Sequence, residues 1–320
     1  TVYLHVLPMF HLGGLLCAYC LVSLAGSNRY MERFDAVEFL ERLESERISA
    51  AALGPVVIGW LLDSPRIEEL DLSALGSIAY GTSPITEPVL RKAMQRLPGA
   101  GFTQIYGQTE ITGTISVLPP DEHVLDGAEA VRLRSAGRAS WGVDVRVVDD
   151  EGREVARNAI GEIVARSPGV MAGYWKDPEQ TAVALRGGWL HTGDVGYMDD
   201  AGFIYVVDRK KDMIVTGGEN VFSSEVERAI ASMPGVAQVA VIGVPHEVWG
   251  EAVHAVVVPA QGVSLGEQEV IAHCRGLIAG FKCPKSVEIR MQALPLSGVN
   301  KIQKHALREP FWKGRSRGVN

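Results

Sequence analysis

The chain is poor in cysteine. Four cysteines in 320 residues are too few for a disulfide framework, so we expect reduced thiols and a cytoplasmic protein. Cys17 and Cys20 form a C-x-x-C pair within an apolar run. No second ligand pair stands at a spacing suited to zinc, which argues against a zinc site. We therefore expect two buried thiols at these positions and no structural metal.

Charge is missing from one region, because residues 1–28 contain no Asp, Glu, Lys or Arg. A secretory signal peptide would begin with positive charge. Pro8, His11 and two glycines interrupt the segment, and the apolar stretch that remains is too short to span a bilayer. The segment instead predicts a buried strand, a turn over residues 8–14 and a buried helix. Since the chain begins with Thr rather than Met, we expect it to be the interior of a longer protein.

Positive charge is not in excess. The chain has 31 Lys and Arg against 38 Asp and Glu, a formal net charge of −7. Proteins that bind nucleic acids need clustered Lys and Arg for the phosphates, so we expect no nucleic-acid partner. The hydrophobic content of 47% excludes a disordered chain. The length predicts about two domains, and the sequence leaves the oligomeric state open.

The first third of the chain alternates short apolar runs with helical patterns. Strands are predicted at residues 50–54, 78–81 and 102–106, and helices over residues 35–43 and 88–96. Asp35 followed by Glu38 is typical of a capped helix start. Short buried strands that alternate with helices predict a parallel sheet with both faces covered. We assign residues 1–128 to this α/β layer.

The middle third has a different pattern. Val143, Val145 and Val147 alternate with polar residues, which is typical of a strand with one buried face. The acidic, glycine-ending segments 149–152 and 199–202 predict turns. Further strands are expected at residues 162–165 and 203–207. Residues 129–207 therefore predict an antiparallel sheet or a small barrel.

Helices return in the last third, residues 208–320. Ser224 with Glu227, and Ser264 with Glu267, are each spaced to cap a helix. Strands are predicted at residues 239–244, 253–258 and 287–290. This region predicts a compact α+β unit of a size normal for one domain.

A strand end in the first third carries residues suited to a nucleotide. In open α/β sheets, ligands bind beyond the carboxyl ends of the strands. Tyr106 can lie against a base, Thr109 can donate to a phosphate oxygen, and Glu110 can hold Mg²⁺ through a hard oxygen ligand. An ordinary strand-to-loop turn explains the same five residues about as well.

Four later segments each allow two interpretations, one as part of a binding site and one as ordinary local structure. Asp194, just past a glycine, can accept the hydroxyls of a ribose or belong to a simple turn. The charged run 208–212 is a solvated connector or a hinge. Paired glycines at residues 217–218 allow close approach of a ligand or form a tight turn. Lys301 and Lys304 are surface lysines by default, and an accompanying nucleotide site would make a catalytic role plausible.

Taken together and in this order, these segments resemble the adenylate-forming superfamily, also called acyl-CoA synthetases or AMP-binding enzymes. The resemblance runs from the segment at residues 7–14 to Lys301, and it is most similar to bacterial fatty-acid–CoA ligases. It implies a partial parallel-sheet layer, a β-barrel-like subdomain and a smaller, mobile α+β lid. It also implies a two-step ligase that uses ATP, Mg²⁺ and CoA with a small-molecule carboxylate.

The resemblance also implies roles for single residues. The nucleotide-binding positions would be Gly81, Thr82, Ser83, Tyr106, Gly107, Asp194 and Arg209. Thr109 would bind the α-phosphate and Glu110 the magnesium ion. Lys301 would reach both the α-phosphate and the acyl carboxylate. The CoA-binding positions would be Gly217, Gly218 and Glu219, with Lys211 as the hinge and His11 beside the acyl pocket.

Two departures from the family pattern bear on activity. The glycine-rich loop that grips the β- and γ-phosphates in the family would lie upstream of Pro8 and is not in this sequence. The family's Gly-Lys pair is Asn300-Lys301 here, and the spacing to Leu307 favours Lys301 over Lys304 as the catalytic lysine. The alternatives to an acyl-CoA ligase are an adenylation domain that loads a carrier protein and a non-catalytic truncated fragment.

Overall fold

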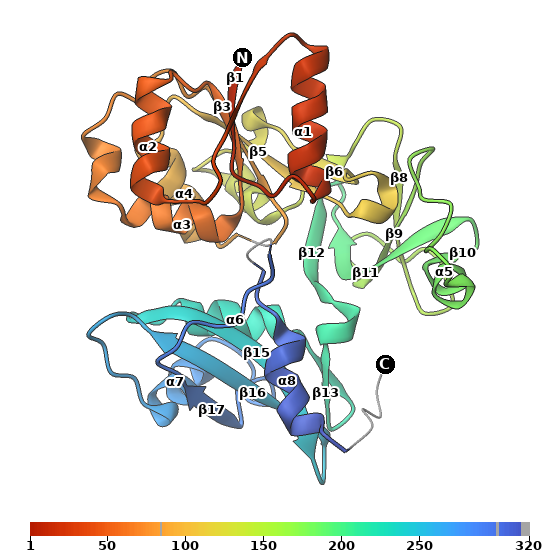
Figure 1. Cartoon of the computed structure of the whole chain (residues 1–320). Helices are drawn as coiled ribbons and strands as arrows, with labels where there is room; N and C mark the ends of the chain where they lie inside the picture. Colours follow the sequence, from red (N-terminus) through yellow and green to blue (C-terminus); the bar gives the residue numbers. More distant parts are fainter. Residues whose placement is uncertain (84, 299–300, 315–320) are drawn as a thin grey trace. The chain divides into compact units, whose positions relative to one another are not determined.

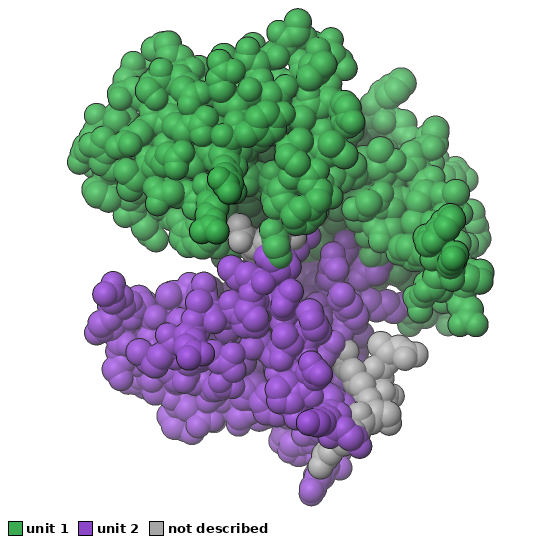
Figure 2. All heavy atoms as spheres, viewed as in Figure 1, with its two compact units in different colours: residues 1–192, 196–206, 298–300 green, residues 193–195, 207–297, 301–320 purple. Residues whose placement is uncertain are grey.

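The computed structural model describes residues 1–83, 85–298 and 301–314, so Asn300 lies outside the described residues. Contacts divide the chain into two compact units (Figures 1 and 2). Unit 1 contains residues 1–192, 196–206 and 298–300, and unit 2 contains residues 193–195, 207–297 and 301–320. The predicted divisions after residues 128 and 207 remain predictions.

A seven-stranded sheet organises unit 1, in the order β2-β1-β3-β4-β5-β6-β7. The strands are β1 (Val2–His5), β2 (Ser27–Tyr30), β3 (Ala50–Leu53), β4 (Ser77–Gly81), β5 (Gly101–Tyr106), β6 (Ser116–Leu118) and β7 (Arg138–Ala139). Strands β1 to β5 pair in parallel, and β6 and β7 add antiparallel strands at one edge. The prediction of a parallel sheet in a mixed α/β fold is confirmed.

The winding of this sheet reverses once. The chain leaves β1 for β2, then returns past β1 to β3 and continues to β4 and β5. Crossovers between parallel strands are right-handed, so the reversal places α1 on the opposite face from α2, α3 and α4. These helices are α1 (Leu12–Ser23), α2 (Ala36–Ser45), α3 (Pro55–Asp63) and α4 (Glu87–Arg96). Figure 1 shows α1 on one side of the strands and the other three on the other side.

The core of unit 1 lies between the sheet and α2, α3 and α4. The α1 helix contributes only a narrow buried face of Gly14, Ala18 and Leu21. Tyr19 and Val22 are 65% and 67% exposed. The prediction of a buried helix is therefore wrong for most of its surface. The prediction of two buried thiols is also wrong, because Cys20 is exposed and Cys17 is only partly buried.

A second sheet of five strands follows along the sequence, in the order β10-β11-β9-β8, with β12 beside β11. Its strands are β8 (Asp144–Val148), β9 (Gly161–Arg166), β10 (Leu185–Arg186), β11 (Trp189–Met198) and β12 (Ile204–Arg209), and α5 (Pro178–Ala184) precedes β10. Gly152 and Gly202 each donate a backbone hydrogen bond to the aspartate three residues earlier, at 3.0 Å. Both predicted turns are therefore confirmed.

Unit 2 is built on a mixed sheet in the order β14-β13-β16-β15, with β17 parallel to β16. Its strands are β13 (Ile214–Thr216), β14 (Glu219–Val221), β15 (Val236–His246), β16 (Gly250–Pro259) and β17 (Ser286–Ile289). Its helices are α6 (Ser223–Ala231), α7 (Glu267–Arg275) and α8 (Lys304–Trp312). The central strands bury both faces, against α6 and α7 on one side and against Leu307 of α8 on the other. Burial on both faces explains their valine-rich sequences.

One of the three predicted helix caps is confirmed and two are wrong. Ser224 does not cap α6, because it lies inside that helix, which begins at Ser223. The carboxylate of Asp35 accepts hydrogen bonds from the amides of Val37 and Glu38, at 3.0 and 2.9 Å. Ser264 lies outside α7, which begins at Glu267. There the Glu269 side chain accepts from the Gly266 amide, at 2.7 Å.

Within residues 1–83, 85–298 and 301–314, no helix is long and apolar enough to cross a membrane.

Candidate functional site

Two of the predicted nucleotide-binding segments lie at the same edge of the large sheet. Strands β4 and β5 pair in parallel with Gly81 opposite Ile105, so residues 81–83 and 106–110 leave adjacent strands at their carboxyl ends. The winding of the sheet reverses between β1 and β3. Such reversals leave a crevice at the carboxyl ends of the strands where ligands bind.

A cavity of about 170 Å³ lies in unit 1 at this edge. Its walls come from the segments that follow β1, β2, β3 and β4, and from Gly298 far along the sequence. The lining residues are Val6, Leu7, Pro8, Phe34, Gly54, Pro55, Val56, Val57, Thr82, Ser83 and Gly298. Thr82 has a left-handed backbone, with φ of 68°. This conformation is strained for a β-branched residue and is more common at ligand sites than elsewhere.

His11, predicted beside the acyl pocket, is not among the described residues that line this cavity. It caps α1, where its Nδ1 accepts a hydrogen bond from the Gly13 amide at 3.2 Å. Its assignment to an acyl pocket remains a prediction.

The connection between β5 and β6 is tightly folded. The Tyr106 carbonyl accepts from the Ile115 amide at 2.8 Å, and the Gln108 carbonyl accepts from the Gly113 amide at 3.0 Å. A Cβ atom at Gly107 would lie 1.8 Å from the Gly113 carbonyl oxygen. Only glycine fits at residue 107. This close approach and the two hydrogen bonds hold the loop that contains Thr109 and Glu110 in one conformation.

Glu110 is held from outside this loop. Its Oε1 accepts a hydrogen bond from the Tyr174 hydroxyl at 2.9 Å, and its carbonyl accepts from the Met171 amide at 2.8 Å. Burial and the nearby Glu110 carboxylate raise the pKa of Tyr174 to about 12, so this hydroxyl remains a donor at neutral pH. Tyr174 lies far along the sequence, and no local pattern points to it.

Glu110 is the predicted ligand of Mg²⁺, and the side chains of the described residues show whether a magnesium ion could be held there. No group of three His, Cys, Asp or Glu side chains suited to a metal occurs among the described residues. Mg²⁺ in phosphate sites is commonly held by one or two carboxylates, phosphate oxygens and water. The single Glu110 carboxylate fits that pattern, with phosphate and water as the remaining ligands.

Four predicted residues come together in unit 2. Asp194, on β11, is 6% exposed, and its Oδ1 lies 3.2 Å from Nε of Arg209. Burial lowers the pKa of Lys301. The positive charges of Arg209 and Lys211 add to this effect, and Asp194 partly offsets it. The two predicted ribose-binding residues, the predicted catalytic lysine and the predicted hinge lysine thus influence one another electrostatically.

The paired glycines form a tight hairpin turn between β13 and β14. Gly217 and Gly218 have φ of 60° and 85°, which two-residue turns of this hairpin type require. The Gly217 amide donates to the Trp249 carbonyl at 2.9 Å. The Trp249 ring stacks on His246 with centroids 4.1 Å apart, and Lys285 Nζ lies 5.3 Å from the ring centroid. A half-exposed aromatic and a cation therefore lie beside the turn.

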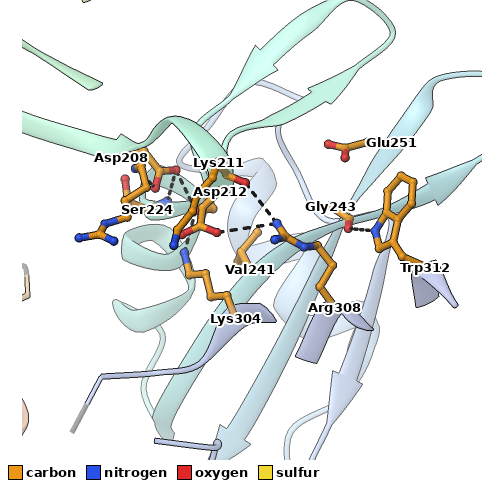
Figure 3. Close-up of polar contacts among 12 residues, drawn as sticks. Asp208, Lys211, Asp212, Ser224, Val241, Gly243, Glu251, Lys304, Arg308 and Trp312 are labelled. Atoms are coloured by element: carbon orange, nitrogen blue, oxygen red, sulfur yellow. Dashed lines mark hydrogen bonds and ion pairs between the residues drawn. The ribbon is translucent and has the colours of Figure 1, made fainter. Parts of the chain in front are cut away.

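The default prediction that Lys304 is a surface lysine is wrong. Only 16% of its side chain is exposed, and its Nζ lies 2.8 Å from Oε1 of Glu227. It also donates to the Ser223 hydroxyl at 2.7 Å. Figure 3 shows Lys304 directed from α8 toward the segment that contains Asp208.

Comparison with known families matches both parts of the chain. Residues 1–175 match the AMP-binding enzyme family, and residues 225–301 match the AMP-binding enzyme C-terminal domain. The chain belongs to the AMP-binding enzyme family. The resemblance inferred from the sequence motifs is thereby confirmed.

Relatives of this AMP-binding chain include named ligases. It is 39% identical to the medium/long-chain-fatty-acid–CoA ligase FadD8 of Mycobacterium tuberculosis, over 98% of this chain and 54% of that protein. It is 36% identical to the fatty acid–[acyl-carrier-protein] ligase ScoC of Streptomyces coeruleorubidus, over 98% of this chain and 60% of that protein. The chain thus spans 54% and 60% of the lengths of these two relatives.

A solved structure has the same fold. The ATP-bound MatB of Rhodopseudomonas palustris superposes with a TM-score of 0.88 at 34% identity, over 97% of this chain and 60% of that chain.

Proposed function

We propose that the protein is an ATP-dependent acyl-CoA ligase, which activates a carboxylate as acyl-AMP and transfers the acyl group to CoA. The proposal concerns a protein of the relatives' full length, because the chain spans 54% and 60% of the first two. The observation that carries it is the grouping of Asp194, Arg209 and Lys301 in unit 2. These are the two sugar-binding groups and the cation that a carboxylate-activating site needs.

In the first step, a carboxylate oxygen attacks the α-phosphorus of ATP, and pyrophosphate leaves. Tyr106 would stack on adenine, Asp194 would accept from the ribose, and Thr109 would donate to the α-phosphate. Lys301 would donate to the α-phosphate and the incoming carboxylate, so that its charge offsets the charge that develops in line. Mg²⁺ held by Glu110 would neutralise phosphate oxygens.

In the second step, the CoA sulfur attacks the acyl carbon, and AMP leaves. AMP is a far better leaving group than hydroxide, which is why the carboxylate is activated first. We assign the approach of CoA to the turn at residues 217–219. The stacked Trp249 ring and the Lys285 cation support this assignment, because a purine and a phosphate favour such neighbours.

We assign the acyl group to the cavity at the carboxyl ends of β1, β2, β3 and β4. Phe34, Val56 and Val57 give it apolar walls, which suit a hydrocarbon or aromatic acid. The Thr82 and Ser83 hydroxyls are the polar groups that a carboxylate could contact there.

The test separates the two half-reactions in the full-length protein. Lys301→Ala should lower carboxylate-dependent ATP–pyrophosphate exchange by at least ~100-fold, because it removes a charge that acts in the transition state. Thioester formation from supplied acyl-AMP and CoA should largely survive. A panel of carboxylates, assayed by pyrophosphate release, would identify the substrate class.

Lys92→Ala is the matched control. Its side chain is 53% exposed and lies 3.9 Å from Asp63, and both half-reactions should be unchanged. Equal loss of both half-reactions in Lys301→Ala would contradict the assignment of Lys301. A full-length protein with no exchange for any carboxylate would support the non-catalytic alternative.

The second candidate is a ligase that loads an acyl carrier protein, because the ScoC relative bears that name at 36% identity. Both acceptors present the same thiol arm, and they differ in what surrounds it. Replacement of Trp249 by Ala should raise the KM for CoA in the CoA-dependent enzyme. A protein that transfers to holo-carrier protein and not to CoA would favour the second candidate.

A further inference from the structure

The start of α8 is anchored in a buried polar network of unit 2. Lys304, the first residue of α8, donates to Ser223 at 2.7 Å and lies 2.8 Å from Glu227. The Ser223 hydroxyl, fully buried, donates to Asp208 Oδ2 at 2.8 Å. The Glu227 carboxylate also accepts from the Val241 amide at 2.8 Å. One ammonium thus joins α8 to α6 and to the end of β12.

A second anchor lies one turn further along the same helix. Arg308 donates to the Lys211 carbonyl at 3.2 Å and lies 3.7 Å from Oδ1 of Asp212. Residues four apart share a helix face, and Figure 3 shows Arg308, like Lys304, directed toward the segment that contains Asp208 and Asp212. The helix therefore has a fixed position on the segment that contains Lys211.

Lys301 lies three residues before Lys304. Backbone hydrogen bonds pair the segment around Lys301 with residues 295–297. The Ser297 amide donates to the Lys301 carbonyl at 2.8 Å, and the Lys301 amide donates to the Ser297 hydroxyl at 3.2 Å. The Gln303 amide donates to the Pro295 carbonyl at 2.8 Å. Because only three residues separate Lys301 from Lys304, a displacement of Lys304 also displaces the Lys301 backbone.

We propose that Lys304 is a positioning residue that fixes Lys301 for the adenylation step, an inference that rests on the proposed function. Lys304 touches no reacting atom and acts through the backbone of residues 301–304. A buried ion pair is a weak source of net stability, but it defines one geometry. Burial disfavours the charge of Lys304, yet the facing carboxylates of Glu227, Asp208 and Asp212 raise its pKa, so the anchor is charged at neutral pH.

This role predicts an effect on one half-reaction only. A displacement of about 1 Å of a catalytic group can cost ~100-fold in rate. Adenylation depends on Lys301 in the proposed function, whereas transfer from acyl-AMP to CoA does not. Loss of the anchor should therefore lower the rate of adenylation and spare the transfer.

The experiment uses the full-length enzyme and measures exchange and acyl transfer separately. Lys304→Met should lower kcat for ATP–pyrophosphate exchange by at least ~10-fold, with KM for ATP within ~3-fold and transfer from acyl-AMP nearly unchanged. Ser223→Ala keeps the Lys304–Glu227 pair and removes one acceptor, so exchange should fall by ~3-fold or more. Lys92→Met is the control and should change neither rate.

The outcomes separate this proposal from the proposed function. A parallel fall of both half-reactions in Lys304→Met would overturn the proposal, because it would show a general loss of folded enzyme. Should Lys304→Met not fold, unchanged exchange in Ser223→Ala overturns it. If Lys301→Ala itself leaves exchange intact, the proposed function fails, and the role of Lys304 fails with it. If Lys301→Ala abolishes exchange and the Lys304 and Ser223 variants do not lower it, only the present inference fails.

Discussion

Asp194 is a carboxylate in the interior of a strand, with 6% of its surface exposed. A buried carboxylate costs free energy unless it is paired. The Arg209 guanidinium, 3.2 Å away and half exposed, supplies the pairing. In the proposed function, this paired carboxylate also accepts a hydrogen bond from a ribose hydroxyl.

At this residue we predict a specific loss of nucleotide affinity. Asp194→Asn removes a charged acceptor worth roughly 1.5–3 kcal/mol in a hydrogen bond. The KM for ATP should therefore rise by ~10- to 100-fold, with a smaller effect on kcat. Steady-state kinetics at saturating carboxylate would measure both constants.

The control for Asp194→Asn is another Asp–Arg pair. Asp144 lies 2.8 Å from Arg166, with both side chains more than half exposed, and exposed pairs contribute little. Asp144→Asn should leave the KM for ATP unchanged. An equal change in both variants would show that loss of any such pair has this effect, and the ribose assignment of Asp194 would be wrong.

The sequence singled out candidate site residues only where a local pattern, such as the end of a predicted strand, marks their position. Tyr106 through Glu110 lie at the end of a strand that is predictable from its apolar run, and this segment by itself fits a ligand site or an ordinary turn about equally well. The partners of such residues were not predictable. Tyr174 binds Glu110, which lies 64 positions earlier in the sequence, and Ser223 binds Lys304, which lies 81 positions later. Pairings of this kind are set by tertiary packing, which a single sequence does not encode in any local pattern.

At the scale of secondary-structure elements, the starts of α2 and α7 show that the same capping pattern does not always form a cap. Asp35 and Ser264 both precede a Glu three residues later, and both spacings predict a cap. Asp35 is the cap of α2. At α7, Gly266 and Glu269 provide the reciprocal hydrogen bond two residues later, and Ser264 is left outside the helix.

Because Asp35 caps a helix and Ser264 does not, we predict that their replacement by alanine lowers the free energy of unfolding by unequal amounts. Asp35→Ala removes an acceptor from two amides at the start of α2 and should lower the free energy of unfolding by ~1 kcal/mol. Ser264→Ala should change it by less than about 0.5 kcal/mol. Urea denaturation followed by circular dichroism would measure both values. Equal losses in the two variants would contradict the cap assignment.

The α1 helix shows where composition misleads. Its apolar sequence predicts burial, but burial depends on what packs against each face. The reversed winding places this helix on the face opposite α2, α3 and α4. The buried residues of this helix are the small residues Gly14 and Ala18, together with Leu21.

At the scale of the whole molecule, three histidines link stability to pH. Burial lowers the pKa of His5, His123 and His254 below the ordinary value of 6.5. The unfolded chain therefore binds more protons than the folded chain between the lowered pKa values and 6.5. The histidine contribution to the free energy of unfolding should fall as pH drops through that window.

Urea denaturation at about pH 7.5 and 5.5 would measure this change. His123→Gln should reduce the pH dependence, because His123 binds Tyr80 and the Pro119 carbonyl, both at 2.9 Å, as a neutral ring. An unchanged pH dependence in His123→Gln would show that this residue does not contribute.

The sequence predicted a parallel sheet in the first third and an antiparallel sheet or small barrel in the middle third, and it did not predict the order of the strands. Alternation of apolar strands with helices indicates a parallel sheet wherever it occurs. Whether the chain winds in one direction or reverses depends on which strands pair over long separations. The position of the cavity depends on this order, and the apolar lining residue Phe34 was not identified from the sequence for that reason.

The reversal of winding at the cavity has a consequence for how this pocket can change. Apart from Gly298, its walls come from separate connections, after β1, β2, β3 and β4, and the strands beneath are held together by the hydrogen bonds of the sheet. One connection can be rebuilt without disturbing the others. In the proposed function, the preference for one acid over another can therefore change one connection at a time, in evolution or by directed mutagenesis, while the sheet stays the same.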